Sequence, residues 1–208
     1  LNGINMNKVT YIEQGLPTSF TVNVEPPIRN VPPLKLMFLG RISPFKGLHI
    51  LIAALDSFSD VDFELSIFGS ADGTDYKSLL KEKTKNKSNI YWKGKLDQSR
   101  VLEEMKQHDI LCLCSTFSEM SPLVIQEARA ARIPVLASNV NGNKEQMENG
   151  ASGFLFEMNN VESLKVELVK IKEDRNQLIE MKGKILMPRN FKDVADDYIK
   201  LYQKTIKK

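Results

Sequence analysis

The segment 34-LKLMFLGRISPFKG-47 decides the fold class, because it joins an apolar strand to a helix through a polar loop that contains glycine. Residues 34–40 form a short apolar run that is typical of a buried strand, and residues 45–57 carry apolar side chains at helical spacing. The same order of strand, loop and helix repeats along the chain. The sequence therefore predicts an α/β fold with a parallel sheet, right-handed crossovers and helices on both faces of the sheet.

Further strands and helices alternate after this segment. Strands are predicted at residues 63–68, 90–92, 110–114, 134–137 and 153–156, and helices at 76–83, 99–106, 123–131 and 161–172. Residues 1–33, with prolines at 26, 27, 32 and 33, are predicted to form an irregular lead-in to one domain over residues 34–189. Residues 190–208 are predicted to form an amphipathic helix, whose apolar stripe requires a surface to pack on.

Composition excludes several classes of protein. The 208 residues, 42% hydrophobic and 26% charged, fit one globular domain rather than a fibre or a disordered tail. The net charge of +3 is spread over the chain, which disfavours nucleic-acid binding, and no apolar run approaches the roughly 18 to 20 residues of a membrane span. The chain begins at Leu1 with no recognisable signal peptide, so we expect a cut point there.

The two cysteines indicate a reducing environment. Cys112 and Cys114 lie two residues apart in an apolar run, and therefore on the same face of a predicted strand. This placement disfavours a disulfide bond between them. We expect free thiols in the core, which are compatible with a cytoplasmic protein.

The loops that follow the predicted strands are the candidate binding elements. In an open parallel sheet, ligands bind beyond the carboxyl ends of the strands. The loops at residues 40–47, 69–73, 94–95, 115–121 and 138–143 all contain glycine or small polar residues. A single glycine reads equally well as an ordinary turn residue, but several at one edge of a sheet favour a binding site.

A predicted helix start supplies an anion site at this edge. Ser121 is predicted to be the N-cap and Pro122 the first helical residue, which leaves the backbone N–H groups of Leu123 and Val124 free to bind an anion. The helix dipole contributes only about 0.3 to 1 kcal/mol, so a diphosphate would also need cationic side chains. The loop after the first strand offers two of them, Arg41 and Lys46.

Two carboxylates flank the helix start. Glu127 lies about one helical turn beyond the free amides, where its carboxylate would repel a phosphate but accept hydrogen bonds from a ribose diol. Glu127 also fits a solvated helix residue, with Ser121 and Pro122 as an ordinary cap. Glu119 precedes the helix and equally fits a loop acid without a role.

These residues together resemble a known family. Gly40-Arg41 and Lys46-Gly47, followed much later by Glu119 and Glu127 with seven residues between them, resemble the carboxyl-terminal domain of retaining glycosyltransferases of the GT-B architecture, group one, also called family four. Further segments that resemble the motifs of the family are Asn2-Gly3-Ile4-Asn5, residues 108–115, Pro134-Val135-Leu136-Ala137-Ser138 and residues 149–155. The resemblance covers essentially the whole chain.

The resemblance implies a Rossmann-like nucleotide-sugar-binding domain, the second domain of a GT-B enzyme. By position, Arg41 and Lys46 would hold the diphosphate of the donor, Glu119 would face the donor sugar, and Glu127 would bind the ribose hydroxyls. The loop at Gly94-Lys95 would border the nucleobase. The implied catalytic residues are Arg41, Lys46 and Glu119, and the implied binding residues are Gly40, Lys95, Met120, Ser121, Leu123, Val124 and Glu127.

Three residues depart from the family pattern. Met120 replaces the commoner glycine, and Asn139 and Asn141 stand where Asp and Gly are usual. These departures bear on the sugar side of the site more than on the nucleotide side. The Asp60-Val61-Asp62 segment matches a metal-binding pattern of a different glycosyltransferase architecture, but it enters a strand from the amino end, opposite the ligand edge. We therefore expect a polar turn there and no metal site.

The resemblance also implies a reaction. A hexosyl group would be transferred from a UDP or GDP sugar to an acceptor hydroxyl with retained configuration, as in polysaccharide biosynthesis, with no cofactor besides the nucleotide-sugar substrate. The acceptor would bind to an N-terminal domain missing from this chain, so the fragment alone is expected to be inactive. The full-length enzyme is expected in the cytoplasm, including its membrane surface. A nucleotide-sugar epimerase of the same architecture and a non-catalytic nucleotide-sugar-binding module remain as alternatives.

Overall fold

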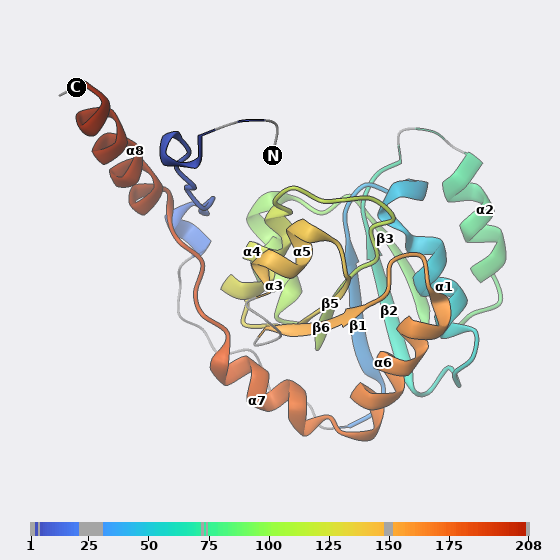
Figure 1. Cartoon of the computed structure of the whole chain (residues 1–208). Helices are drawn as coiled ribbons and strands as arrows, with labels where there is room; N and C mark the ends of the chain where they lie inside the picture. Colours follow the sequence, from blue (N-terminus) through green and yellow to red (C-terminus); the bar gives the residue numbers. More distant parts are fainter. Residues whose placement is uncertain are drawn as a thin grey trace.

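A parallel sheet of six strands forms the centre of the molecule. The computed structural model describes residues 3, 5–20, 31–71, 73, 75–147 and 152–206. Its strands are β1 (Leu34–Leu39), β2 (Phe63–Phe68), β3 (Ile90–Gly94), β4 (Ile110–Leu113), β5 (Val135–Ser138) and β6 (Gly153–Phe156). They lie in the order β3-β2-β1-β4-β5-β6, and every pairing is parallel (Figure 1). The predicted parallel sheet is confirmed, and its strand order reverses between β1 and β4, where such sheets bind ligands.

Helices cover both faces of this sheet, as predicted. They are α1 (Leu48–Leu55), α2 (Asp75–Thr84), α3 (Val101–Met105), α4 (Leu123–Ala130), α5 (Asn141–Gln146), α6 (Val161–Glu173), α7 (Asn176–Lys184) and α8 (Phe191–Ile206). Figure 1 shows α1, α2 and α6 on one face and α3, α4 and α5 on the other. Neighbouring β1 residues Met37 and Phe38 belong to opposite core clusters because successive strand residues point to opposite faces.

Two helices were not predicted. Residues 138–143 were expected to be a loop, yet residues 141–146 form α5; its sequence NGNKEQ has no apolar residue to reveal a helical period. The short helix α7, at residues 176–184, is mainly polar and buries only Leu178 and Lys182. Both helices are held by tertiary contacts that leave little trace in the local pattern.

The predicted helix at 45–57 is wrong at its start. Residues Pro44–Lys46 form a short 3-10 helix, Gly47 has a φ of +65°, and α1 begins at Leu48. The break follows from close packing, because a Cβ atom at Gly47 would lie 1.8 Å from the carbonyl oxygen of Cys114. A side chain at this position would therefore prevent the loop after β1 from contacting the end of β4.

Both cysteines are buried in the core, as predicted. Cys112 and Cys114 are free thiols in the cluster that packs under α1 and α6. Burial raises the pKa of the Cys114 thiol to about 12 and also raises the pKa of Cys112. Neither thiol is therefore an ionised nucleophile at neutral pH.

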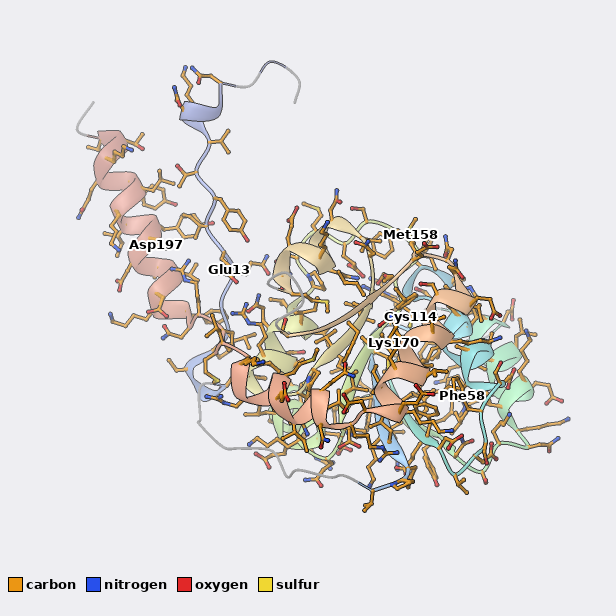
Figure 2. All side chains as sticks on the ribbon, turned by 60° about the horizontal axis from the view of Figure 1, so that its bottom comes forward. Glu13, Phe58, Cys114, Met158, Lys170 and Asp197 are labelled. Atoms are coloured by element: carbon orange, nitrogen blue, oxygen red, sulfur yellow. The ribbon has the colours of Figure 1, made fainter. Side chains whose placement is uncertain are left out.

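The amino-terminal segment and α8 lie side by side, away from the sheet (Figures 1 and 2). Leu16 and Phe20 anchor the segment, since both are buried in the core on the α3 and α4 face. The N–H of Leu16 donates to the carbonyl of Arg189, and the N–H of Phe191 donates to the carbonyl of Leu16. Residues 1, 2, 4, 21–30 and 149–151, and with them parts of two quoted motifs, lie outside the described residues.

The apolar stripe of α8 has no complete partner within the part of the chain that the structure describes. Phe191, Tyr198 and Tyr202 are 57%, 44% and 58% exposed, and no residue of α8 is buried. The packing surface that the stripe requires stays a prediction. Across the described ranges, each helix is too short or too polar to cross a bilayer.

Candidate functional site

Three loops meet at the carboxyl edge of the sheet through backbone contacts. The loop after β1 packs against the loop after β4, where the N–H of Thr116 donates to the carbonyl of Phe45 at 2.8 Å. On the other side, the N–H of Gly142 in α5 donates to the carbonyl of Glu119 at 3.0 Å. A Cβ atom at Gly142 would lie 2.1 Å from that carbonyl oxygen. The loop at residues 115–121 is thus held between its two neighbours.

Lys46 and Glu119 form an ion pair at the centre of this edge. The Nζ atom of Lys46 lies 2.5 Å from Oε1 of Glu119, and the hydroxyl of Ser115 donates to the same oxygen at 2.5 Å. Glu119 is only 8% exposed, so the ammonium group compensates a carboxylate with little access to water. No described residue donates to Oε2 of Glu119, and this atom is not fully buried. Oε2 is the oxygen available to a ligand.

Lys46 is also fixed by an aromatic ring. Its Nζ atom lies 5.3 Å from the ring centroid of Phe117, which itself meets Phe45 edge to face. About a quarter of the Lys46 side chain remains exposed. Since an ammonium group carries three donors, Lys46 can bridge Glu119 and a bound anion.

Glu127 lies on α4 in a different environment. It is also 8% exposed, but its described partner is neutral: Nε2 of Gln98 donates to Oε1 of Glu127 at 2.6 Å. Burial raises the pKa of the Glu127 carboxyl, and the hydrogen bond from Gln98 offsets part of this effect. A ligand that donates hydrogen bonds to Glu127 would stabilise its ionised form.

The start of α4 differs by one residue from the prediction. Pro122 is the N-cap, with φ of −69° and ψ of 112°, and the helix begins at Leu123; the prediction of Ser121 as N-cap is wrong. The hydroxyl of Ser121 instead accepts a hydrogen bond from Gln146 on α5. Helix geometry still leaves the N–H groups of Leu123 and Val124 without an intrahelical acceptor. The expected anion-binding amides are therefore present.

The remaining predicted residues are spread along the same edge. Arg41 is exposed in the loop after β1, and Gly40 directly follows that strand, with its N–H donating to the carbonyl of Phe68. Met120 is 92% exposed at the tip of the loop before α4. Lys95 follows β3 directly and is exposed. The structure therefore brings Lys46 and Glu119 into contact, while the side chain of Met120 is exposed to solvent and Lys95 makes no recorded contact with the pair.

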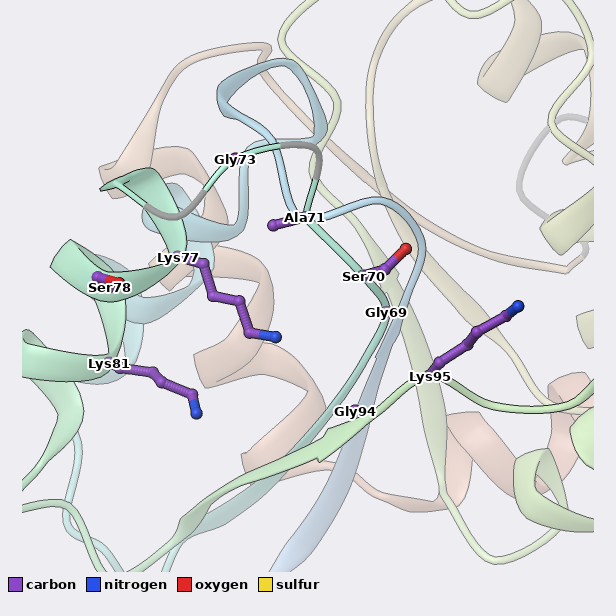
Figure 3. Close-up of a pocket in the computed structure, with 9 residues that line it drawn as sticks. All are labelled: Gly69, Ser70, Ala71, Gly73, Lys77, Ser78, Lys81, Gly94 and Lys95. Carbon is purple, nitrogen blue, oxygen red and sulfur yellow. The ribbon is translucent and has the colours of Figure 1, made fainter.

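A pocket of about 510 Å³ opens where β2 and β3 end (Figure 3). Figure 3 shows the side chains of Lys77 and Lys81 extending from α2 toward the space in front of Gly94, while the side chain of Lys95 points away from them. The lining residues are Gly69, Ser70, Ala71, Gly73, Lys77, Ser78, Lys81, Gly94 and Lys95. The pocket lies at the end of the edge where the sequence predicts the nucleobase, and it is separate from the Lys46–Glu119 pair.

Asp60 and Asp62 lie at the opposite edge of the sheet, as predicted. Asp62 directly precedes β2 and forms an ion pair with Lys172 at 2.9 Å, and Asp60 accepts a hydrogen bond from Ser88. Within the ranges that the structure describes, no three His, Cys, Asp or Glu residues are grouped in a way that could hold a metal ion. Metal independence of the site stays a prediction.

This geometry can now be compared with known proteins. The family model described as glycosyl transferases group 1 matches residues 23–184. The chain belongs to this family. Relatives include an uncharacterized glycosyltransferase of Methanocaldococcus jannaschii, which is 34% identical over 136 residues, covering 65% of this chain and 37% of the relative. The chain thus spans little more than a third of that relative.

Solved structures show the same fold. A glycosyltransferase from Rickettsia africae matches with a TM-score of 0.81 and 21% identity, covering 98% of this chain and 59% of that one. Anabaena HepE, solved in complex with UDP-glucose, matches with a TM-score of 0.68 and 25% identity, covering 74% of this chain and 43% of that one. The Rossmann-like fold of this group 1 glycosyl transferase is therefore that of GT-B enzymes.

Several polar residues of this group 1 glycosyl transferase site were not singled out from the sequence. Ser115 and Gln98 are the partners of the two glutamates, and Gln146 is the partner of Ser121. Ser115 lay within a loop that the sequence marked, but Gln146 comes from a helix that was not predicted. No spacing rule connects these side chains, because the fold alone brings them together.

Proposed function

We propose that this chain is the donor-binding domain of a retaining glycosyltransferase, which transfers a hexosyl group from a nucleoside diphosphate sugar to an acceptor hydroxyl. The observation that carries the proposal is the Lys46–Glu119 pair beside the free amides of α4, at the carboxyl edge of a Rossmann-like sheet. Membership of the group 1 family supports a transferase, and the UDP-glucose complex of HepE supports a nucleotide-sugar donor.

The cationic residues act on the leaving group. Arg41, Lys46 and the N–H groups of Leu123 and Val124 would bind the diphosphate and stabilise the negative charge that develops on it as the sugar departs. Lys46 would stay bonded to Glu119 through one proton and bind phosphate through another. The pair thus presents a fixed ammonium group, whose side-chain entropy is already lost before the donor binds.

The two carboxylates bind the two sugars of the donor in this proposal. Oε2 of Glu119 would accept hydrogen bonds from hydroxyls of the transferred hexose, with the amides of Met120 and Ser121 beside it. Glu127 would accept the two ribose hydroxyls, and the nucleobase would lie near Gly94 and Lys95. The diphosphate lies between the two carboxylates in this arrangement, which keeps each of them on a neutral part of the donor.

The whole protein would supply the rest of the reaction. The acceptor would bind to a further domain, and the base that accepts its proton would come from that domain or from the donor phosphate. We propose that no metal ion is required, since Arg41, Lys46 and a helix N-terminus face the diphosphate charge.

Calorimetric titration tests the proposal. The chain should bind UDP or GDP more tightly than the corresponding monophosphate, and Arg41→Ala should remove about 1.5 to 3 kcal/mol of binding free energy for the diphosphate, the range of a hydrogen bond to a charged group. Lys184→Ala, which removes an exposed cation of α7, is the matched control and should bind like the wild type. Equal affinities of the wild type for monophosphate and diphosphate would contradict the proposal.

A further inference from the structure

A series of buried polar side chains runs from the last turn of α4 to the loop before this helix. Arg129, Gln126 and Gln146 are 6%, 1% and 7% exposed. The NH1 atom of Arg129 donates to Oε1 of Gln126 at 3.3 Å, and Nε2 of Gln126 donates to Oε1 of Gln146 at 2.8 Å. Nε2 of Gln146 then donates to the hydroxyl oxygen of Ser121 at 3.1 Å. Arg129, Gln126 and Gln146 were not predicted to contact the donor. Their hydrogen bonds nevertheless lead to Ser121, which was predicted to bind it.

Arg129 and Glu13 together set the direction of every bond in this series of side chains, because Nε2 of Gln126 also donates to Oε1 of Glu13 at 3.4 Å. An isolated glutamine amide can be turned by 180°, but a guanidinium group can only donate, so Gln126 must present its oxygen to Arg129. The nitrogen of Gln126 then faces Gln146, which must also present its oxygen. Turning either amide would place two N–H donors against each other at a buried position, at the cost of unpaired polar groups.

The far end of the chain is anchored outside α4. The Nε atom of Arg129 donates to the carbonyl of Leu186 at 3.1 Å, and NH1 lies 3.3 Å from Oε1 of Glu13. Glu13 balances the charge of Arg129 and belongs to the amino-terminal segment, while Leu186 follows α7. These contacts fix the guanidinium group, and with it the direction of both amides.

The hydrogen bond from Gln146 to Ser121 leaves the hydroxyl hydrogen of Ser121 available to another acceptor. Its hydroxyl oxygen is occupied by the N–H of Gln146, and no described residue accepts a hydrogen bond from it. Accepting a hydrogen bond also makes a hydroxyl a better donor. Ser121 is partly exposed and lies two residues before the free amide of Leu123, at the positive end of α4.

We infer that Arg129, Gln126 and Gln146 are positioning residues that turn the Ser121 hydroxyl into an obligate donor toward the diphosphate bound at α4. Ser121 thereby becomes a further binding residue of the donor site through its side chain. The inference rests on the proposed function, because it needs an anion at the start of α4. It adds a neutral donor to the site without adding charge.

Binding measurements on matched variants test this inference. Gln146→Leu and Ser121→Ala should each weaken UDP or GDP binding about threefold to tenfold, the effect of one lost hydrogen bond, and leave the binding of uridine or guanosine unchanged. The double variant should bind no more weakly than either single variant, because both changes remove the same bond. Gln203→Leu, the same exchange at an exposed position of α8, should have no effect.

The direction of the hydrogen bonds between these side chains has its own test. Arg129→Lys keeps a donor-only side chain and should bind the diphosphate within about twofold of the wild type, while Arg129→Met combined with Glu13→Met removes both groups that orient Gln126 and should lose as much affinity as Gln146→Leu. Thermal unfolding of each variant reports separately on structural damage, which would lower nucleoside and diphosphate binding together.

The outcomes separate the two proposals. Additive losses in the double variant, or equal losses of affinity for nucleoside and diphosphate, would overturn the positioning role of Arg129, Gln126 and Gln146. The proposed donor site would still stand in that case if the wild type binds the diphosphate more tightly than the monophosphate. A wild type that does not bind UDP or GDP would overturn both.

Discussion

Glu119 and Glu127 are equally hidden, yet they differ in what surrounds them. Each carboxylate is 8% exposed. Glu119 receives an ammonium group and a hydroxyl, whereas Glu127 receives one neutral amide. The comparison teaches that burial alone does not set the character of a carboxylate: the charge of Glu119 is balanced within the protein, and the charge of Glu127 is not.

The site therefore has two ends that differ in how far protein donors balance the carboxylate: the charge of Glu119 is balanced, and that of Glu127 is not. At the Glu119 end, protein donors occupy one oxygen and fix the side chain before any ligand arrives. At the Glu127 end, two ribose hydroxyls would supply the donors that the protein lacks, which would lower the raised pKa of Glu127. Nucleotide affinity should therefore rise with pH as Glu127 ionises.

The largest effect is expected when the Lys46–Glu119 pair is broken. Lys46→Met leaves the buried carboxylate without its cation and should lower the free energy of unfolding by about 2 to 4 kcal/mol, measured by urea denaturation. Adding Glu119→Gln should restore most of the loss, because the double variant has no uncompensated charge. An unchanged urea midpoint in Lys46→Met would show that the pair is a solvated surface contact.

The next effect separates the carboxylates by ligand. Glu127→Ala should weaken binding of ribonucleoside diphosphates by about 1.5 to 3 kcal/mol and weaken the binding of 2′-deoxy analogues, which keep only the 3′-hydroxyl, by a smaller amount. Glu119→Ala should not change the ratio of the two affinities. The measurement is calorimetric titration with UDP and 2′-deoxy-UDP. Equal weakening of both ligands by Glu127→Ala would remove the ribose role.

A smaller effect sharpens the electrostatic side of the comparison. Burial raises the pKa of the Glu127 carboxyl in the folded chain above its value in the unfolded chain. The unfolded chain therefore loses this proton at a lower pH than the folded chain does. The stability of the wild type should therefore fall as pH rises from the ordinary range of glutamate through the raised pKa, and stay level above it. Glu127→Gln should remove this contribution and raise stability at pH 7 by less than about 1 kcal/mol. Thermal unfolding at several pH values measures it.

The smallest expected effect is that of a chelator. Each carboxylate already accepts a hydrogen bond from a protein donor at one oxygen, and Asp60 and Asp62 bond to Ser88 and Lys172 at the far edge. Adding EDTA should leave the affinity for UDP or GDP unchanged in calorimetric titration. A large loss of affinity on chelation would instead indicate a metal ion held at the site together with the donor.

The sequence predicted the elements whose residues carry their own signal. Apolar runs such as residues 34–39 located the strands, and the loops after them located the ligand edge. The helix start was misplaced because the conformation of Pro122 depends on its surroundings, and the break at Gly47 depends on the carbonyl of Cys114, which is far along the chain. A local sequence pattern cannot predict contacts between residues that are distant in the sequence.

The site was predicted at the level of residues but not of partners. Arg41, Lys46, Glu119 and Glu127 were selected by type, spacing and resemblance, and their ligand roles stay predictions. The pairing of Lys46 with Glu119 spans 73 positions, and the cation was expected to serve the diphosphate alone. The folded structure shows that this ammonium group bonds to Glu119, and its role toward the diphosphate stays a prediction.

The close contacts at Gly47 and Gly142 have a consequence for the range of sequences that this fold accepts. A side chain on Gly47 would collide with the carbonyl oxygen of Cys114 at the end of β4, and one on Gly142 with the carbonyl oxygen of Glu119 in the loop that follows. In a library of random variants selected for a folded protein, both positions should stay glycine, whereas Met120, whose side chain is 92% exposed, should accept almost any residue. The most permissive position of the loop thus adjoins one of its most restrictive contacts, so the tip of the loop can vary in sequence while its base stays fixed.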